Sequence, residues 1–227
     1  MSGIFVTGTD TGVGKTRVAT GLCRVYAGRG LRVAAMKPVA SGCLQTPLGL
    51  RNDDALALQA AATVRAAYEE VNPFAFEAAI APHIAAADAG IVVDPAVLDR
   101  AFERLVLRSD HIVVEGAGGW LVPLGPAGSF ADLAVHWRLD VVLVVGLRLG
   151  CINHALLSTE AIERRGLRLT GWVGNSIEPA FARQDANLEA LRERIAAPCL
   201  GVLPHAPQMS PDEVAAILGA DAVLRSP

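Results

Sequence analysis

Lysine is nearly absent from this sequence. Of the 20 lysine and arginine residues only Lys15 and Lys37 are lysine, and both lie near the N-terminus in loops rich in glycine or serine. Arginine supplies the positive charge everywhere else. A lysine ammonium is a compact point charge, whereas the arginine guanidinium is a broad planar fork. The two exceptions therefore indicate sites where a small cation is required.

Long apolar runs, cysteine pairs and a strong net charge are also lacking. The longest apolar run, Val141–Leu147, is far shorter than the roughly 20 residues that span a bilayer, and the first residues lack the basic segment of a signal peptide. A net charge of −3 with scattered arginines gives no reason to expect nucleic acid or a membrane as a partner. Four cysteines without a C-x-x-C pair predict a reducing, cytoplasmic protein without disulfides or structural zinc.

Short β-branched runs alternate with longer amphipathic segments along the chain. This repetition of strand, crossover helix and strand predicts an α/β fold with a mainly parallel β-sheet flanked by helices. Neither an internal repeat nor a linker rich in Pro, Gly or Ser divides the sequence, so residues 1–227 are expected to form a single domain. The stretch Arg51–Gly90 fits the alternation least and is expected to form helical insertions or a flap on the substrate side.

The expected elements follow from periodicity and from glycine and proline punctuation. Strands are predicted at Ile4–Thr7, Arg32–Met36, His111–Glu115, Val141–Gly146, Leu169–Gly174 and Cys199–Leu203. Helices are predicted at Lys15–Gly28, Asp53–Ala62, Pro95–Arg108, Asn153–Arg165, Arg183–Ile195 and Pro211–Leu218, with Asn153 a candidate N-cap.

The clearest site motif is the glycine-rich segment Gly8–Thr16. It follows a predicted strand and opens a predicted helix, which is the setting of a phosphate-binding loop. Backbone N–H groups can cradle polyphosphate oxygens, Lys15 can reach the β and γ phosphates, and Thr16 can ligate Mg²⁺. The usual first glycine of such a loop would fall at Thr9, one residue after Gly8. A chance glycine-rich turn is the alternative, which the scarcity of lysine disfavours.

A second motif places a carboxylate at a strand end. The apolar run Ile112–Val114 leads into Glu115 and then into the glycine-rich segment Gly116–Gly119. The carboxyl edge of a parallel sheet is where the metal-side acid of a phosphate-loop enzyme belongs. Taken alone, Glu115 would be interpreted as a capping or solvent-facing acid. Beside the phosphate loop it is the candidate Mg²⁺ partner of Thr16.

Three further motifs are weak by themselves. Asp53 and Asp54 precede an apolar run and favour helix capping, although either could supply a magnesium ligand. The turn Gly150–Asn153 enters a helix and would expose N–H groups that suit a carboxylate. Asn175 follows a strand and could pair with N6 and N7 of adenine, an ordinary turn asparagine being the default.

Taken together and in order, these motifs resemble the dethiobiotin synthetase family from about Ile4 to Pro204. The segments Lys37-Pro38-Val39-Ala40-Ser41-Gly42 and Gly150-Cys151-Ile152-Asn153-His154 are far more specific to that family than a phosphate loop is. The family carries out the ATP-dependent carboxylation that closes the ureido ring in biotin biosynthesis. The resemblance implies a homodimer of the P-loop type that uses ATP, Mg²⁺, carbon dioxide and 7,8-diaminononanoate.

The resemblance also implies residue roles. It assigns Lys37, Lys15 and Ser41 to catalysis, with Lys37 and Ser41 holding the reacting carbamate and the γ-phosphate. It overrides the capping interpretation of Asp54, which would join Thr16 and Glu115 as magnesium ligands. The distal carboxylate of the substrate would be clamped across the dimer interface by Gly150, Cys151, Ile152 and Asn153. The nucleotide would be bound by Thr11, Gly12, Val13, Gly14, Lys15, Thr16, Glu115, Asn175 and Pro204.

Two departures from the family pattern concern the ends of the site. The family often places an aromatic residue near the carboxylate clamp, in the segment where this chain has Asp185-Ala186-Asn187. Gly12 replaces a residue that is frequently charged, which we expect to be tolerated.

The implied mechanism needs positioning and charge neutralisation more than a general base.

The main alternative is a partitioning or division-site switch ATPase of the same broad fold, resembling ParA and MinD. Those proteins carry an extra lysine early in the loop, at the position where this chain has Asp10. A second alternative is an amidotransferase-type ligase, which needs a separate glutamine-cleaving domain for which no residues remain.

Overall fold

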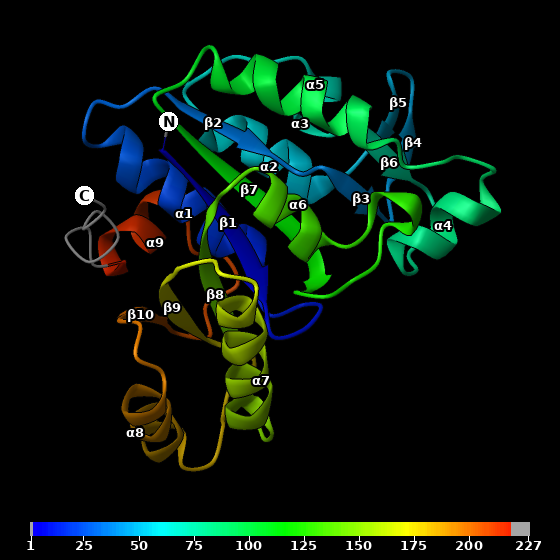
Figure 1. Ribbon diagram of the computed structural model, residues 1–227. Coiled ribbons are helices and arrows are strands. Elements are labelled where there is room, and N and C mark those ends of the chain that lie inside the picture. The colour runs from blue at the N-terminus through cyan, green and yellow to red at the C-terminus, as the bar shows by residue number, and fades with distance from the viewer. Residues whose placement is uncertain (1, 219–227) are drawn as a thin grey trace.

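The computed structural model describes residues 2–218, and six parallel strands form its central sheet (Figure 1). The strand order is β10-β9-β8-β1-β7-β2, with every neighbouring pair parallel. The strands are β1 (Ser2–Gly8), β2 (Val33–Met36), β7 (His111–Gly119), β8 (Asp140–Leu147), β9 (Leu169–Ser176) and β10 (Cys199–Leu203). The predicted α/β fold with a mainly parallel sheet is therefore confirmed.

Helices cover both faces of this sheet, because alternate strand residues feed two separate apolar cores. One core packs Val6, Val113 and Val144 against α1 (Lys15–Ala27), α2 (Asp53–Ala61) and α9 (Pro211–Ile217). The other packs Phe5 and Val114 against helices on the opposite face (Figure 1). These helices include α5 (Pro95–Val106), α6 (Phe130–His136), α7 (Cys151–Arg164) and α8 (Gln184–Arg194). Strands buried on both faces have nearly continuous apolar sequences, which is why the strands could be predicted from the sequence.

Residues 39–90 build a small irregular layer beside the sheet. Two short strands, β3 (Val39–Ser41) and β6 (Phe74–Phe76), pair in parallel, and β4 (Leu44–Thr46) and β5 (Gly49–Arg51) form a hairpin. Two short helices, α3 (Tyr68–Val71) and α4 (Pro82–Asp88), complete it together with α2. The expected helices are present, but the four strands were not predicted, because three residues are too few to show an alternation. Further along the chain lies the short 3₁₀ helix η1 (Gly125–Ala127).

Three local expectations about helix termini were wrong. α7 begins at Cys151 rather than Asn153, and its N-cap is Gly150, whose φ of 93° suits glycine. α8 begins at Gln184 after Arg183, which has a left-handed φ of 58°. The N-cap of α2 is Asn52, which accepts a hydrogen bond from the Ala55 N–H at 3.2 Å, so neither aspartate caps that helix. In α7 and α2 the N-cap lies one to three residues before the predicted one, whereas α8 begins one residue after its predicted start.

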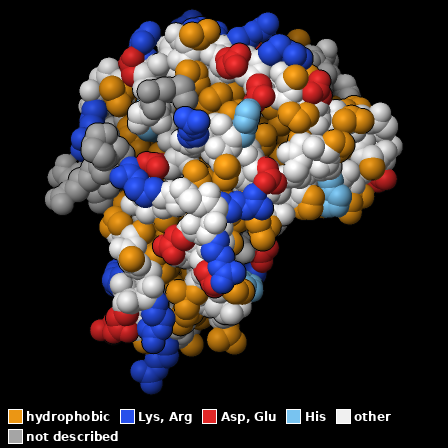
Figure 2. Space-filling model, in the orientation of Figure 1, with side chains coloured by type: hydrophobic (Ala, Val, Ile, Leu, Met, Phe, Trp, Pro, Cys, Tyr) orange, Lys and Arg blue, Asp and Glu red, His pale blue; other side chains and the backbone are white. Residues whose placement is uncertain are grey.

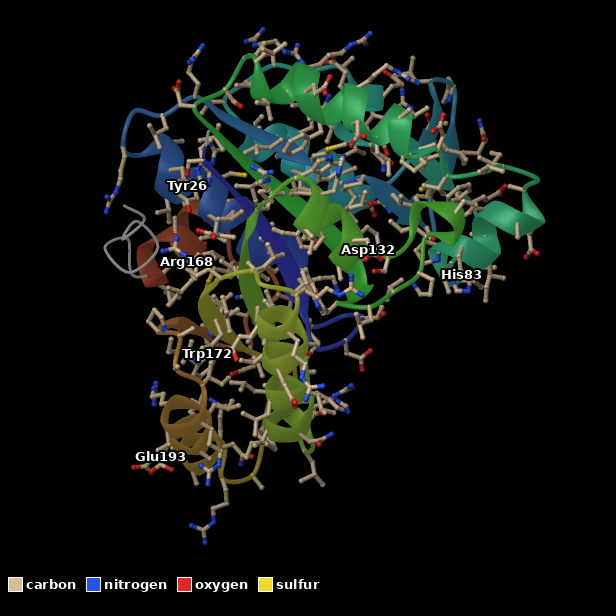
Figure 3. All side chains as sticks on the ribbon, viewed as in Figure 1. Tyr26, His83, Asp132, Arg168, Trp172 and Glu193 are labelled. Carbon is tan, nitrogen blue, oxygen red and sulfur yellow. The ribbon has the colours of Figure 1, made fainter. Side chains whose placement is uncertain are left out.

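On the face shown in Figure 2, basic and acidic side chains are interspersed, and no large area carries charge of one sign. Within residues 2–218, no helix has both the length and the apolar content needed to cross a membrane. The largest fully buried side chain is Trp172 of β9, which belongs to the core beneath α7 and α8 (Figure 3).

Candidate active site

The glycine-rich loop between β1 and α1 turns through two left-handed glycines. Gly12 has a φ of 73° and Gly14 a φ of 93°, a region that glycine enters without steric cost. Gly14 is the N-cap of α1 and has no side chain to cap the helix, so the first N–H groups of α1 can face an anion. Lys15 extends back over the loop and donates from Nζ to the Asp10 carbonyl at 2.9 Å. The predicted phosphate-loop geometry is present.

Lys15 is only 7% exposed, and its surroundings lower the pKa of its ammonium to about 8. Burial is the largest cause, and the nearby charge of Lys37 adds to it. The carboxylates of Glu115, Asp54 and Asp10 act to raise this pKa but do not outweigh burial and Lys37. A loop with a destabilised ammonium and exposed N–H groups is prepared for a polyphosphate anion.

Lys37, at 3% exposure, lies between two carboxylates from distant parts of the chain. Its Nζ donates to Glu115 Oε1 at 2.5 Å, to Asp54 Oδ2 at 3.0 Å and to the Gly116 carbonyl at 3.2 Å. Burial alone would lower the pKa of Lys37, but the two carboxylates outweigh burial and raise it. The ammonium is therefore held in its charged form.

The backbone around Lys37 is fixed by a hydrogen-bond chain. The Lys37 N–H donates to the Val71 carbonyl at 2.7 Å, and Asn72 Nδ2 donates to the Lys37 carbonyl at 2.7 Å. Asn72 Oδ1 in turn accepts from the Tyr68 hydroxyl at 3.0 Å. Sequence reasoning missed Asn72 and Tyr68, since neither lies in a motif. They show that the insertion between β2 and β7 holds Lys37 in place.

Thr16 and Glu115 meet as predicted, although 99 positions separate them. Thr16 Oγ1 donates to Glu115 Oε1 at 2.8 Å. The second oxygen, Glu115 Oε2, is fully buried and has no hydrogen-bond partner, and the same is true of Ser41 Oγ. A buried oxygen without a hydrogen-bond partner costs free energy. A bound ligand or metal ion could provide the partners that Glu115 Oε2 and Ser41 Oγ lack.

A cavity of about 720 Å³ joins these groups. Asp54 lines it, whereas Asp53, the next residue before it, is exposed and does not. The structure thus distinguishes between the two acids in favour of Asp54, whose pKa is lowered by Lys37 against the opposing effect of burial. The predicted site residues on the cavity wall are Thr11, Gly12, Gly14, Lys15, Thr16, Lys37, Ser41, Asp54 and Glu115.

Asn175 and Pro204 lie behind the loop, at the carboxyl ends of β9 and β10. Asn175 Nδ2 donates to the Val13 carbonyl at 2.9 Å, so the asparagine is tied to the loop directly. Arg17 bridges the group, donating from Nη1 to Asn175 Oδ1 and to the Pro204 carbonyl, each at 3.2 Å. Arg17 directly follows Gly14-Lys15-Thr16, and only that adjacency could have drawn attention to it.

Comparison with known proteins agrees with this geometry. The AAA domain family model matches residues 2–213. The ATP-dependent dethiobiotin synthetase of Pseudomonas paraeruginosa is 55% identical over 219 residues, which cover 96% of each chain. The protein of the same name from Xylella fastidiosa is 52% identical over 207 residues, 91% of this chain and 92% of its own. This chain belongs to the dethiobiotin synthetase family.

Solved structures add a likeness at the level of the fold. The MinD cell division protein of Aquifex aeolicus has a TM-score of 0.59 at 17% identity, over 98% of this chain and 95% of its own. The septum site-determining protein MinD of Pyrococcus horikoshii, solved with Mg-ADP, has a TM-score of 0.54 at 16% identity, over 99% of this chain and 90% of its own. This chain therefore shares its fold with these two MinD proteins.

The turn Gly150–Asn153 lies away from the cavity of about 720 Å³. Gly150 is exposed before α7, Cys151 is 2% exposed, and Asn153 is exposed in the first turn. None of the four residues lines the cavity of about 720 Å³. The preceding residue, Leu149, is 92% exposed and lies at the same end of α7.

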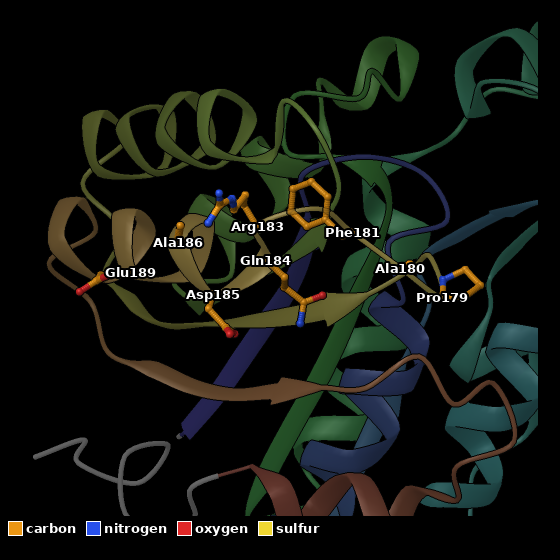
Figure 4. A pocket seen from close by; sticks show the side chains of 8 residues that line it. All are labelled: Pro179, Ala180, Phe181, Arg183, Gln184, Asp185, Ala186 and Glu189. Carbon is orange, nitrogen blue, oxygen red and sulfur yellow. The ribbon is translucent and has the colours of Figure 1, made fainter.

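A second, polar cavity of about 680 Å³ lies beside the loop between β9 and α8 (Figure 4). Asp185, Ala186 and Glu189 line it from α8, and Phe181 lines it from the loop. The aromatic residue that the family often places in this segment is missing at Asp185-Ala186-Asn187. Phe181, four positions before Asp185, is the aromatic side chain among the residues that line this cavity.

Proposed function

We propose that this chain is an ATP-dependent dethiobiotin synthetase, which carboxylates 7,8-diaminononanoate with CO₂ and closes the ureido ring while ATP becomes ADP and phosphate. One observation carries the proposal. A buried lysine, Lys37, is held by Glu115 and Asp54 on the wall of the cavity that the phosphate loop opens into. The 55% identity to a curated synthetase along nearly the whole chain supports the same reaction.

The residues around Glu115 fit a magnesium ion. Mg²⁺ prefers oxygen ligands and is usually bound by one or two carboxylates together with phosphate oxygens and water. Thr16 Oγ1, Glu115 Oε2 and the Asp54 carboxylate provide such oxygens, and Glu115 Oε2 lacks any other partner. When bound, the ion supplies positive charge that polarises the terminal phosphates. Within residues 2–218, there is no group of three or more His, Cys, Asp or Glu that could hold a metal ion.

The chain's own cations account for the chemistry. A carbamate forms on one substrate amine, and a carbamate oxygen attacks the γ-phosphorus, so that the bond to ADP breaks. The second amine then attacks the carbamate carbon, phosphate leaves, and the protons of the amines pass to solvent. Lys15 and Lys37 bring ammonium charges to a site crowded with anions, and Ser41 Oγ can donate its proton to one of the oxygens. Such positioning and neutralisation are the main work of phosphoryl transfer.

The substrate carboxylate would bind at the N-terminus of α7, on the N–H groups of Gly150, Cys151, Ile152 and Asn153. These residues do not line the cavity of their own chain, so the proposal requires a second copy that brings its α7 to the cavity. The exposed Leu149 supports a contact there. We therefore propose a homodimer in which each cavity is completed by the partner chain.

The switch ATPase is the second candidate, favoured by the likeness to MinD structures. At 17% and 16% sequence identity, this likeness shows a shared fold and nothing about function. The position of the additional lysine of such proteins is occupied by Asp10, which pairs with Arg148 within the same chain. An acid paired in this way cannot supply a positive charge to a partner's nucleotide.

The deciding experiment is incubation of the purified protein with ATP, Mg²⁺, bicarbonate and 7,8-diaminononanoate, followed by mass spectrometry for the ureido product and by a phosphate assay. We expect product and phosphate in equal amounts, both dependent on the diamine. Phosphate release without the diamine, stimulated by DNA or lipid vesicles, would instead identify a switch ATPase.

A further inference from the structure

Arg17 makes an unusual set of contacts for a residue of a phosphate-loop helix. Its Nη1 donates to Asn175 Oδ1 and to the Pro204 carbonyl, and its Nη2 donates to the Ala206 carbonyl at 2.8 Å and to Met209 Sδ at 3.3 Å. The guanidinium thereby joins α1, the end of β9 and the segment that follows β10. Its Nε is buried without a partner, and burial lowers the pKa of the group. Arg17 is only partly buried, and hydrogen bonds from its guanidinium to several acceptors hold it in a defined geometry.

Two opposite partners fix the orientation of the Asn175 amide. On one side the guanidinium donates to Oδ1, and on the other side Nδ2 donates to the Val13 carbonyl. A flipped amide would place its NH₂ against the guanidinium N–H groups and its oxygen against a carbonyl oxygen, so both contacts would become repulsive. Because Asn175 is 4% exposed, it has little room to find other partners.

The fixed amide retains one lone pair on Oδ1 and one N–H on Nδ2. Adenine presents an amino donor at N6 and an acceptor at N7, which match an amide acceptor and donor side by side. A 6-oxopurine presents two acceptors, O6 and N7, so its oxygen would face Oδ1. The orientation held by Arg17 is therefore the one that favours a 6-aminopurine.

We propose that Arg17 is a positioning residue that selects ATP over 6-oxopurine nucleotides, by fixing the Asn175 amide and the Pro204–Met209 segment around the base. The inference rests on the proposed function, since it takes the nucleotide to lie on this loop with its base at Asn175. Arg17 and Gly14 both line the cavity of the phosphate loop, and the Arg17 guanidinium also contacts Asn175 and the Pro204 carbonyl.

The experiment compares ATP with inosine triphosphate, which differs at the 6-position, in steady-state dethiobiotin formation. The Arg17→Met variant keeps the length and apolar packing of the side chain but removes all its donors. We expect the KM for ATP to rise about tenfold, with kcat at saturating ATP changed less than about twofold, because tenfold corresponds to the loss of one good base contact. The KM for inosine triphosphate should change less than about twofold, so the ATP preference falls.

Arg24→Met is the matched control, because Arg24 lies on the same helix and pairs with Asp212 of α9 but touches neither Asn175 nor Pro204. It should keep the wild-type preference. Arg17→Lys, which restores one cationic donor, should recover part of the preference, and it serves as the readout if Arg17→Met does not fold.

The inference would be overturned if KM rose equally for both nucleotides in Arg17→Met, or in Arg17→Lys if only that variant folds. Arg17 would then only stabilise the structure. This result differs from failure of the proposed function, in which the wild-type protein makes no dethiobiotin with either nucleotide. Calorimetric titration of each nucleotide into the same variants checks that the changes in KM reflect binding.

Discussion

Lys37 Nζ lies 2.5 Å from Glu115 Oε1 in a site where the lysine is 3% exposed and the glutamate fully buried. An ion pair so deeply buried stabilises a protein little, because desolvation offsets most of the attraction. Its value is positional: the pair places an ammonium beside the one oxygen of Glu115 that also accepts from Thr16. Lysine fits this gap because its charge is compact.

The first prediction follows from that fit. We expect Lys37→Arg to retain the fold and ATP binding but to lose turnover by about a hundredfold, the scale on which a misplaced electrostatic contact slows a reaction. Circular dichroism, calorimetric titration with ATP and the product assay measure the three properties. Arg32→Lys is the control, since Arg32 pairs with Asp110 in an exposed ion pair away from the cavity. Near-wild-type turnover in Lys37→Arg would refute the requirement for lysine.

The second prediction concerns pH and Lys15, whose pKa is lowered to about 8 by burial and by Lys37. The ammonium that meets ATP phosphates is present below pH 8 and is lost as the pH rises above it. Bound phosphate favours the charged form, so ATP binding above pH 8 must take up a proton, and the affinity should fall about tenfold between pH 7 and pH 9. Calorimetric titration in two buffers of different ionisation enthalpy should show that the protein takes up about 0.75 proton for each ATP bound at pH 8.5.

Lys15→Arg tests the assignment of that proton. A guanidinium stays charged across this range, so any remaining ATP affinity of the variant should not change between pH 7 and pH 9. A wild-type affinity that is equally flat would show that Lys15 does not titrate.

The third prediction compares two glycines of one loop. A Cβ at Gly14 would lie 2.3 Å from Asn175 Nδ2, whereas a Cβ at Gly12 would meet nothing within 4 Å, and both have positive φ. Gly12→Ala should therefore show only the cost of a left-handed alanine, about 1–2 kcal/mol. Gly14→Ala should cost more and should also weaken ATP binding at least about tenfold, since the asparagine must move. Thermal unfolding and ATP titration measure both; equal effects of the two variants would contradict the contact with Asn175.

The fourth prediction concerns the proposed dimer. Leu149 is 92% exposed before α7, and Leu107 is 82% exposed after α5. If α7 meets a partner chain, Leu149→Glu should shift the protein from dimer to monomer in light scattering and reduce product formation together with it, because a carboxylate would be buried in the contact. Leu107→Glu adds the same charge elsewhere and should leave both unchanged. A dimer that survives Leu149→Glu with full activity would exclude this face.

The central strands could be predicted because each is a short, mostly apolar run, a pattern that needs no knowledge of neighbours. The strands of three residues between Val39 and Phe76 could not, because their pairing depends on which segments the fold brings together. The predicted start of α2 at Asp53 is correct, but its N-cap was misassigned for a similar reason. Asn52, Asp53 and Asp54 are all good capping residues, and the choice of Asn52 frees Asp54 to face Lys37.

The sequence by itself determined the layered fold, the phosphate loop and the pairing of Thr16 with Glu115. Those features arise from local periodicity, from glycine conformations and from the common edge at which parallel strands end. Only the tertiary structure decided the hydrogen-bond chain from Tyr68 to Lys37 and the bridge from Arg17 to Asn175, which are 158 positions apart. These contacts join residues whose types are ordinary at their positions. A side chain's partners depend on packing between distant segments, and no short motif records that packing.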